Sequence, residues 1–504
     1  MQQGLVLRQA LPLPEVKLTN ASPEASDLGF PINLATALAL SGARPLIVTA
    51  AQAAAWVAEA QLERAEVLWV PTLDLGSVYM RHDGVGPDLN NGTNLPPFAP
   101  FTPRVPIRQY MNYFYTGAGF VLAVATTEAI FQPLVARQVL TARRWNVQSA
   151  KNDALLATAE AYFSVHQYRG TYAGAVDAVA RGRKLVGRIT DLSQDLVPRV
   201  EINRAMRLLA DLEQQAALAR QRWRVASANL TLVLRLSPSV VVLPAEPDHL
   251  QITLIDPSRS LDQLLPIALK HRPELASQRA LIAAAEQRIR REKSRPFLPI
   301  VLLTGWQSPG EMTEFGIFGT GPGSNLNNWS FRTDVSVQLV WQFENLGLGN
   351  LARIKDQRAQ ESRAIVRLYA IQDRVAAEVT EAQATLQSAA ARVVEAERAL
   401  RNAIINFDRN YEGLRHTKRF SNFLYLVIRP QEADIALEHL MVSYRQYFGS
   451  VADYNRAQFE LFHALGYPAE EIANLHPPGN VVAVRGRRPF GLPPVPEGPP
   501  PATR

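Results

Sequence analysis

The side chains most often used for catalysis and metal binding do not form a recognisable site in this 504-residue sequence. The eight histidines lack the spacing of metal ligands, and His439 and His463 fall in helical patterns, where an exposed or hydrogen-bonded histidine is commoner than a ligand. The absence of cysteine excludes disulfides, thiolate metal sites and a cysteine nucleophile. No carboxylate pair or Ser/His/Asp grouping stands out. We therefore expect no enzyme activity, no cofactor and no bound metal.

Two glycine-rich segments, 117–119 and 319–323, superficially resemble phosphate-binding loops. A phosphate loop lies between a strand and a helix of a βαβ unit, and neither segment has that setting. The formal charge of +7 and the pI near 9.6 are compatible with nucleic-acid binding. However, the basic residues are dispersed among Glu and Asp along helical patterns, so we expect no nucleic-acid partner.

Basic residues do gather around two predicted helix-to-helix turns. The residues concerned are Arg199, Arg204 and Arg207 at the first turn, and Arg415, Lys418 and Arg419 at the second. In one interpretation they are ordinary solvent-exposed turn residues. In the other, several chains converge there, and a ring of positive charge at an opening controls the aperture or binds an adaptor. The sequence leaves both interpretations open.

Two periodicities meet between residues 331 and 412. Apolar and polar residues alternate from Phe331 to Phe343, which is typical of a strand. We expect one face of this strand to contact lipid and the other to face a wet lumen. The expected lipid-facing residues are Val335, Val337, Leu339 and Trp341. Residues 351–412 contain neither Gly nor Pro and have apolar positions every seven residues, which predicts a very long helix in a left-handed coiled coil.

The same order of elements occurs twice, which indicates an internal duplication. Pro45 and Pro71 correspond to Pro273 and Pro299 at one common offset. Each half is predicted to contain a helix, a strand, a long loop, a second strand, a very long helix and a return helix. The predicted divisions are an extended leader (1–30), repeat 1 (31–236, with a loop at 81–112), a connector (237–259), repeat 2 (260–470, with a loop at 307–330) and a disordered Pro-rich tail (471–504).

Local signals define the boundaries of several elements. Four strands are predicted, at 68–80, 120–124, 297–306 and 331–343. Gln132–Pro133 is expected to open the first long helix, and Ser260 with Gln263 matches a capping box. The first 30 residues lack the charged start and apolar core of a secretory signal.

With these elements in place, the sequence resembles the TolC-like outer membrane efflux family. The closest local matches are residues 261–275, similar to the family's opening helix motif, and 297–300 at the strand that follows. The resemblance covers about residues 31–470. It implies a mostly α fold with membrane β structure, in which long coiled-coil helical hairpins form an α-barrel. Each chain is then expected to contribute four strands to a trimeric transmembrane β-barrel.

The resemblance also implies a function and partners. It suggests a homotrimer in the lipid of the outer membrane, projecting into the periplasm. Such a trimer is a passive exit duct of a tripartite efflux or type I secretion system, and it docks to a periplasmic adaptor and an inner-membrane pump. The family's small Gly-Leu-x-Ser type turn is not evident at 200–204 or 420–424, so its acidic aperture residues cannot be transferred to this sequence.

The main alternative is a structural or adaptor coiled-coil protein without a membrane barrel. The strand pattern at 331–343 favours the duct, because a water-soluble coiled coil does not need alternating strands attached to its helices. An enzyme or a nucleic-acid binder would need a pocket or a basic stripe that the sequence does not contain.

Overall fold

The computed structural model describes residues 6–7, 27–41, 45–70, 72–86, 107–194, 196–304, 315–322, 326, 328–333, 336–420 and 423–467. The chain divides into two compact units, each assembled from segments that are distant in sequence. Unit 1 comprises Met1–Ala53, Arg144–Ala276 and Tyr369–Arg504, and unit 2 comprises Ala54–Arg143 and Ser277–Leu368. The expected tail (471–504) and most of the expected leader (1–30) lie outside the described residues.

Eight α-helices dominate the described residues. They are α1 (Leu34–Ser41), α2 (Leu46–Glu66), α3 (Thr126–Leu192), α4 (Val200–Val233), α5 (Leu261–His271), α6 (Pro273–Ser294), α7 (Leu348–Gly413) and α8 (Pro430–Ala464). Two short 3-10 helices are η1 (Val67–Trp69) and η2 (Glu344–Gly347). By length and composition, 34–69 is the one described helical stretch that would suit a membrane span, a property that core helices share.

The strands in the described residues are shorter than most helices. They are β1 (Val6–Leu7), β2 (Leu28–Ile32), β3 (Thr72–Gly86), β4 (Ile107–Ala125), β5 (Val240–Pro244), β6 (Ile252–Thr253), β7 (Ile300–Thr304), β8 (Phe315–Pro322), β9 (Asn328–Thr333), β10 (Ser336–Val340), β11 (Thr417–Phe420) and β12 (Phe423–Leu426). The mostly helical content predicted from the sequence is therefore confirmed.

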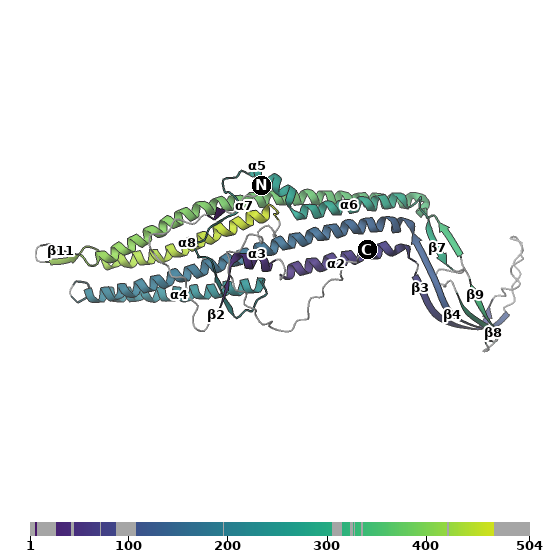
Figure 1. The fold of residues 1–504 in the computed structure, drawn as a ribbon, viewed down its shortest axis with the longest axis horizontal. Coiled ribbons are helices and arrows are strands. Elements are labelled where there is room, and N and C mark those ends of the chain that lie inside the picture. Colours follow the sequence, from purple (N-terminus) through teal and green to yellow (C-terminus); the bar gives the residue numbers. More distant parts are fainter. Residues whose placement is uncertain are drawn as a thin grey trace. The chain divides into compact units, whose positions relative to one another are not determined.

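Unit 1 is built around long helices packed in pairs. In Figure 1, α4 lies beside the part of α3 that precedes it in the chain, and α8 lies beside α7. The seven-residue row predicted in α7 is buried, with Val379, Leu386 and Leu400 each at 0% exposure. Leu212 and Trp223 occupy the buried seam of α4, at 1% exposure each. The hydrophobic periodicity thus identified correctly which face of α7 forms the core.

The connector after α4 is held to α8 by side chains that interrupt the apolar pattern. Gln458 is fully buried, and its Oε1 accepts hydrogen bonds from the backbone N–H groups of Leu254 (3.0 Å) and Ile255 (2.9 Å). Asn455 accepts one from the N–H of Ile252 (2.8 Å). These amides satisfy the backbone N–H groups of the connector where it packs against α8, which explains why polar residues are buried there.

Unit 2 contains one antiparallel sheet of six strands, which occupy four positions side by side. β3 pairs with β4 along its whole length, from Thr72 opposite Val121 to Gly86 opposite Ile107. On its other side β4 pairs with β8 and then with β7. β9 pairs with β8 and β10 with β7, so β7/β8 and β9/β10 occupy the third and fourth strand positions.

Several predicted strand boundaries were wrong. Residues 81–86 and 107–112, assigned to a loop, belong to β3 and β4, and part of the second expected loop forms β8 and β9. Long-range pairing overrides the weak strand propensity of these Gly- and Asn-containing segments. Conversely, β3 begins at Thr72 because residues 67–69 form η1.

The expected single strand 331–343 is also divided. β9 ends at Thr333, β10 covers Ser336–Val340, and residues 341–343 are not in a strand. Apolar and polar residues continue to alternate across the division, but the partner strand changes from β8 for β9 to β7 for β10. The sequence pattern alone therefore could not reveal that the strand is divided. Val335 lies outside the described residues.

Two predicted helix starts differ in detail. α3 begins at Thr126, directly after β4, so that Pro133 lies inside the helix instead of opening it. Ser260 does precede α5, but its side chain makes no capping hydrogen bond, and the N–H of Gln263 donates to the Ser260 carbonyl. A backbone turn therefore replaces the expected capping box at this position.

Candidate functional site at the two helical turns

The structure brings the two predicted basic turns together within unit 1. The α3–α4 turn and the segment between α7 and α8 lie at the same end of the helices of this unit (Figure 1). The side-chain amide of Gln431, at the start of α8, donates to Glu201 Oε1, at the start of α4, over 3.1 Å. Arg188 of α3 also donates to the Leu414 carbonyl after α7 (3.3 Å).

The predicted basic residues occupy different positions in these turns. Arg199 is the residue before α4, and Arg204 and Arg207 lie in its first two turns. Arg415 follows α7 and places its guanidinium 6.0 Å from the ring centre of Tyr411. The side chains of Arg199, Arg204, Arg207, Arg415 and Lys418 are exposed, and that of Arg419 lies outside the described residues.

A β-hairpin, and not a simple turn, joins α7 to α8. Lys418 pairs with Tyr425 and Arg419 with Leu424 in the β11–β12 ladder. The sequence interpretation missed this element. Its signal was present, since Thr-Lys-Arg-Phe and Phe-Leu-Tyr-Leu flank a Ser-Asn dipeptide, a spacing typical of a two-residue hairpin loop.

Two carboxylates, the buried Glu201 and the half-buried Asp434, lie next to the basic residues of the first turn. Arg204 Nη1 is 2.6 Å from Glu201 Oε1, and Glu201 is only 6% exposed. Asp434, one turn into α8, also acts electrostatically on Glu201. Within the described part of the chain, Glu201 Oε2 and Asp434 Oδ1 are buried without a hydrogen-bond partner. The first turn therefore combines acidic and basic charge, and is not purely a positive cluster.

Burial gives Asp434 an unusual protonation equilibrium. Desolvation, followed by the nearby charge of Glu201, raises the pKa of the Asp434 carboxyl to about 6, while Arg204 acts in the opposite direction. Asp434 therefore changes charge close to neutral pH. This residue was not singled out from the sequence, because its environment depends on the contact between α4 and α8.

A second polar network joins three helices further from the turns. Arg181 of α3 forms ion pairs with Asp177 (2.6 Å) and with Asp408 of α7 (2.5 Å). The hydroxyl of Tyr444, on α8, donates to Asp177 Oδ2 over 2.9 Å. Burial, and then the carboxylate of Asp177, raise the pKa of Tyr444 far above its ordinary value, so the hydroxyl keeps its proton. The network therefore acts as a fixed cross-link between α3, α7 and α8.

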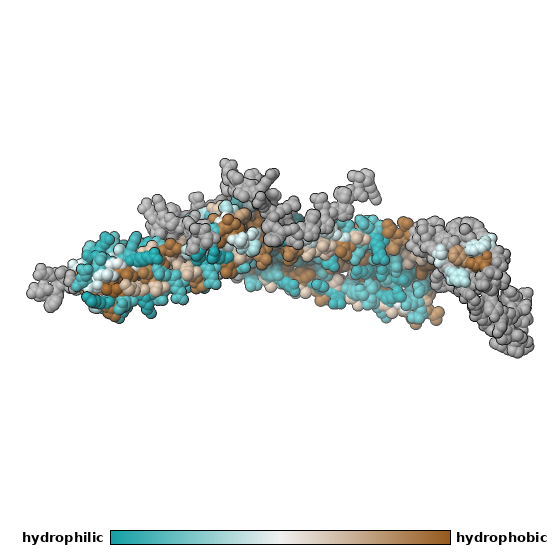
Figure 2. All heavy atoms as spheres, turned by 90° about the horizontal axis from the view of Figure 1, so that it is seen from below, coloured by the Kyte–Doolittle hydropathy of each residue, from teal (hydrophilic) through white to brown (hydrophobic). Residues whose placement is uncertain are grey.

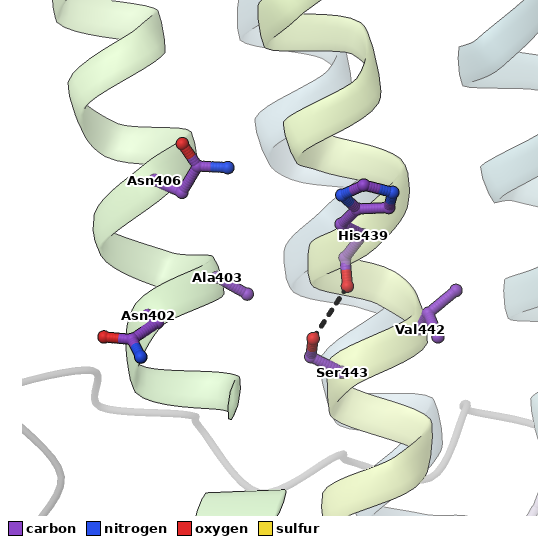
Figure 3. A pocket seen from close by; sticks show the side chains of 6 residues that line it. All are labelled: Asn402, Ala403, Asn406, His439, Val442 and Ser443. Carbon is purple, nitrogen blue, oxygen red and sulfur yellow. Dashed lines mark hydrogen bonds between the residues drawn. The ribbon is translucent and has the colours of Figure 1, made fainter. Parts of the chain in front are cut away.

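A shallow groove of about 420 Å³ lies between α7 and α8 on the protein surface (Figure 3). It is lined by Asn402, Ala403, Asn406, His439, Val442 and Ser443. The Ser443 hydroxyl donates to the His439 carbonyl (2.8 Å), so this hydrogen bond stays within α8. No group of three or more His, Cys, Asp or Glu residues in the described ranges is placed to hold a metal ion.

The sequence matches no protein-family model and no curated protein. Solved structures match it at the level of the fold. The outer membrane protein VceC from Vibrio cholerae aligns with 86% of this chain and 96% of its own, at 15% identity and a TM-score of 0.62. The CmeC outer membrane channel of Campylobacter jejuni aligns with 93% of this chain and 98% of its own, at 13% identity and 0.63.

The open MtrE outer membrane channel of Neisseria gonorrhoeae aligns with 92% of this chain and 98% of its own, at 15% identity and 0.63. The chain has the fold of an outer-membrane efflux channel. The resemblance inferred from the sequence is thereby confirmed for the fold.

In the outer-membrane channel fold, the strand expected to face lipid lies in unit 2. Val337, Leu339 and Trp341 are 65%, 53% and 49% exposed. Val340, on the opposite face, is also exposed, at 40%. Both faces of β10 are uncovered in the single chain, so exposure does not distinguish lipid from lumen. The lipid-facing assignment remains a prediction.

Proposed function

We propose that this protein is the protomer of a homotrimeric outer-membrane channel, acting as the passive exit duct of a tripartite efflux or type I secretion system. The channel fold supports this proposal. The adaptor, the pump and the periplasmic projection follow from the family resemblance. The two repeats, 31–236 and 260–470, belong to the same proposal, supported by the similar order of helices and strands in each.

The sheet of unit 2 is the observation that carries the proposal. Within the described residues, β3 pairs only with β4, and β9 and β10 pair only with β8 and β7. The sheet therefore has two open edges, whose N–H and C=O groups cannot remain unpaired in lipid. Four strands are too few to close a barrel with a filled interior, for which about eight are needed. Pairing between the edges of neighbouring copies solves both problems.

The helices of unit 1 also present surface that a neighbouring copy can cover. On the face seen in Figure 2, hydrophobic side chains are interspersed with hydrophilic ones along the helices. Large apolar residues of α4 and α7 are more than one-third exposed in the single chain; examples are Val200, Met206, Leu218, Val225, Val394 and Ile405. Burial of such residues between copies would stabilise an oligomer by roughly 25 cal/mol per Å² of apolar surface removed from water.

Disulfide cross-linking tests the edge-to-edge closure, because the chain has no cysteine of its own. One cysteine is placed on β3 by Ser77→Cys, and a second is moved in turn along β9 and β10. Oxidation of the membrane fraction is expected to give dimers and trimers on denaturing gels at the position of correct register. Native mass measurement in detergent is expected to give three copies.

The matched control is Ser77→Cys with Thr116→Cys, since Ser77 and Thr116 are partners within one β3–β4 ladder. This pair is expected to form a disulfide inside a single chain and to leave the protein monomeric on the gel. A stable monomer in the soluble fraction, with no cross-link between copies at any position, would contradict the channel and favour a coiled-coil structural or adaptor protein.

A further inference from the structure

A β-hairpin projects from the end of unit 1 where α7 is joined to α8. Its strands, β11 and β12, lie past the ends of these two helices (Figure 1). Within the described residues, each of the two strands pairs only with the other. A two-stranded hairpin is marginally stable on its own in water, and antiparallel helices need only a short loop between them. Reversal of the chain direction therefore does not by itself account for this hairpin.

Packing holds the base of the hairpin against the helices. Leu426 and Ile428 pack against the hydrophobic core of unit 1, in which Leu414, directly after α7, is fully buried. A Cβ at Gly413 would overlap the Ile428 side chain, so this close approach requires glycine. Pro430 then opens α8. The hairpin is therefore fixed at its base, and its outer edge is formed before any partner arrives.

The register shows which backbone groups point outward along the β11 edge. The Val427 N–H donates to the His416 carbonyl over 3.1 Å, so these two residues form a hydrogen-bonded pair. Hydrogen-bonded and non-hydrogen-bonded pairs alternate along an antiparallel ladder. Thr417 and Arg419, which are opposite Leu426 and Leu424, consequently direct their N–H and C=O groups away from β12. These groups form a regular row that a further strand can pair with.

One face of the hairpin is exposed beside this edge. Opposite residues of a ladder share a face of the sheet, so Lys418 lies on the same face as Tyr425. Lys418 is exposed, and Tyr425 is 49% exposed. Leu426, one position further along β12, belongs to the other face and packs against the core. A strand added at the β11 edge would thus have its alternate side chains next to a cation on the exposed face.

The charge of the segment is entirely positive. No Asp or Glu occurs from Gly413 to Gln431, whereas the segment contains Arg415, Lys418, Arg419 and Arg429. Among the described side chains, no carboxylate forms a salt bridge with Arg415, Lys418 or Arg429. This differs from the α3–α4 turn, where Arg204 is paired with Glu201. Three of the four cations lie on β11 or directly before it, so the positive charge is concentrated at the β11 edge.

We propose that the β11 edge binds an acidic, extended segment of a partner protein, which adds to the hairpin as a third strand. In this mode of recognition the backbone hydrogen bonds supply affinity and the alternate side chains supply specificity. The acidic side chains would neutralise Lys418 and its neighbours, and the third strand would stabilise a hairpin that is marginal by itself. The inference adds a mode of recognition to the proposed function without depending on it, because the edge exists whether or not unit 2 lies in a membrane.

Other occupants fit the edge less well. The hairpin of a second copy carries the same positive charge, and like charges on neighbouring strands are destabilising. An anionic lipid surface or a nucleic acid could neutralise the cations, but neither has a row of alternating donors and acceptors that matches a strand edge. An acidic polypeptide is the partner that satisfies both the charge and the backbone groups.

Peptide binding to the full-length protein in detergent tests the proposal. The probe is a short fluorescein-labelled peptide in which Glu and Val alternate, and binding is followed by fluorescence anisotropy. A peptide with Lys in place of Glu is the charge control, and the acidic peptide with alternate backbone nitrogens methylated is the backbone control. Each control peptide is expected to bind at least about ten-fold more weakly than the probe, because the first lacks the charge complementarity and the second lacks the backbone donors.

Two changes in the protein separate backbone from charge. Thr417→Pro removes one outward N–H without altering the charge or the ladder with β12, and it is expected to weaken binding of the acidic peptide by about ten-fold. Thr417→Val is the matched control and is expected to have little effect. Lys418→Glu is expected to weaken binding several-fold at low salt, and by less as the salt concentration rises. Circular dichroism checks that each variant folds, and the methylated peptide tests the edge on the unaltered protein if Thr417→Pro does not.

Equal affinity for the methylated and unmethylated acidic peptides would overturn strand addition. Equal affinity for the acidic and basic peptides would overturn the charge argument. Sedimentation with phosphatidylglycerol vesicles that requires Lys418, without any preference among the peptides, would replace the acidic segment by a lipid surface. Native mass measurement on the same sample tests the channel separately: a trimer that binds no peptide leaves the proposed function standing, and a monomer that binds the acidic peptide leaves only this inference.

Discussion

Asp434 has an environment that its local sequence does not suggest. Its neighbours on α8 are ordinary helix-forming residues, but its Oδ1 is buried and unpartnered among the described residues, close to the charge of Glu201. The pairing of Arg204 with Glu201 could be anticipated, because residues three apart lie on one helix face. The approach of Asp434 could not, since it depends on how two helices distant in sequence pack.

Asp434→Asn is expected to stabilise the protein above pH 6 and to have little effect near pH 4. The folded-state pKa of about 6 exceeds the ordinary value of 3.8, so the folded protein binds more protons and its free energy of unfolding falls as the pH rises through this window. Asparagine removes that loss. With part of the carboxyl still in contact with solvent, the gain at pH 7.5 is on the order of 1–2 kcal/mol.

Urea unfolding at pH 4 and pH 7.5 measures this difference. Glu432→Gln is the control, because Glu432 lies two residues before Asp434 on α8 but is exposed. Equal stability of Asp434→Asn and the unaltered protein at pH 7.5 would show that the carboxyl is not penalised by burial.

At the scale of elements, α3 and α8 approach closely through two glycines. A Cβ at Gly174 would come within 2.6 Å of the Tyr444 side chain, and one at Gly170 would meet the ring of Phe448. The heptad pattern predicted the buried face of α7, because apolar residues that recur every seven positions lie on one side of a helix. It could not predict this contact, because a glycine in a helical segment is equally consistent with a weak point in an exposed helix.

Gly174→Ala is expected to lower the free energy of unfolding by about 1–3 kcal/mol, because the methyl group meets the base of the Tyr444 ring and not a flexible tip. Gly187→Ala provides the control in the same helix. Nothing lies within 4 Å of a Cβ at 187, so this change is expected to stabilise α3 by about 0.5–1 kcal/mol. Thermal unfolding followed by circular dichroism compares the two. Destabilisation by both would point to a backbone effect and not to the contact with Tyr444.

The strands show a different limit of sequence interpretation. The alternation at 331–343 correctly indicated β structure, and the number of strand positions in the sheet is four, as expected. The lengths of β3 and β4 were underestimated, because segments such as Arg81–Gly86 acquire strand structure from pairing with β4. The β11–β12 hairpin was missed because a helical hairpin was expected to have a short turn.

At the scale of the whole molecule, the basic turns gain their proposed role only if three copies assemble. The interpretation as a ring controlling an aperture and the interpretation as solvated turn residues both remain open for a single chain. Arg204 is a poor position at which to test these interpretations, because it is already paired with Glu201. Arg207 and Arg419 are the better choice.

Reversing both charges, by Arg207→Glu and Arg419→Glu, is expected to lower the preference for anions in planar-bilayer recordings. Several negative charges near a common axis attract cations, and the effect should weaken as salt rises from about 0.1 M to 1 M, where the Debye length falls from about 10 Å to 3 Å. Arg374→Glu is a control on α7, away from the turns, because Arg374 is also exposed. Unchanged conductance and selectivity, together with unchanged adaptor affinity, would leave these residues as solvated turn residues.

Because α3 follows β4 without a connecting loop, this part of the chain cannot readily gain or lose residues. β4 ends at Ala125 and α3 begins at Thr126, with no intervening residue to absorb an insertion. One residue added within β4 would move every later side chain of the strand to the opposite face of the sheet, or would force a bulge. One residue added early in α3 would turn the rest of the helix by about 100° relative to the strand. Insertions and deletions near this boundary should therefore be rarer among related genes than single substitutions.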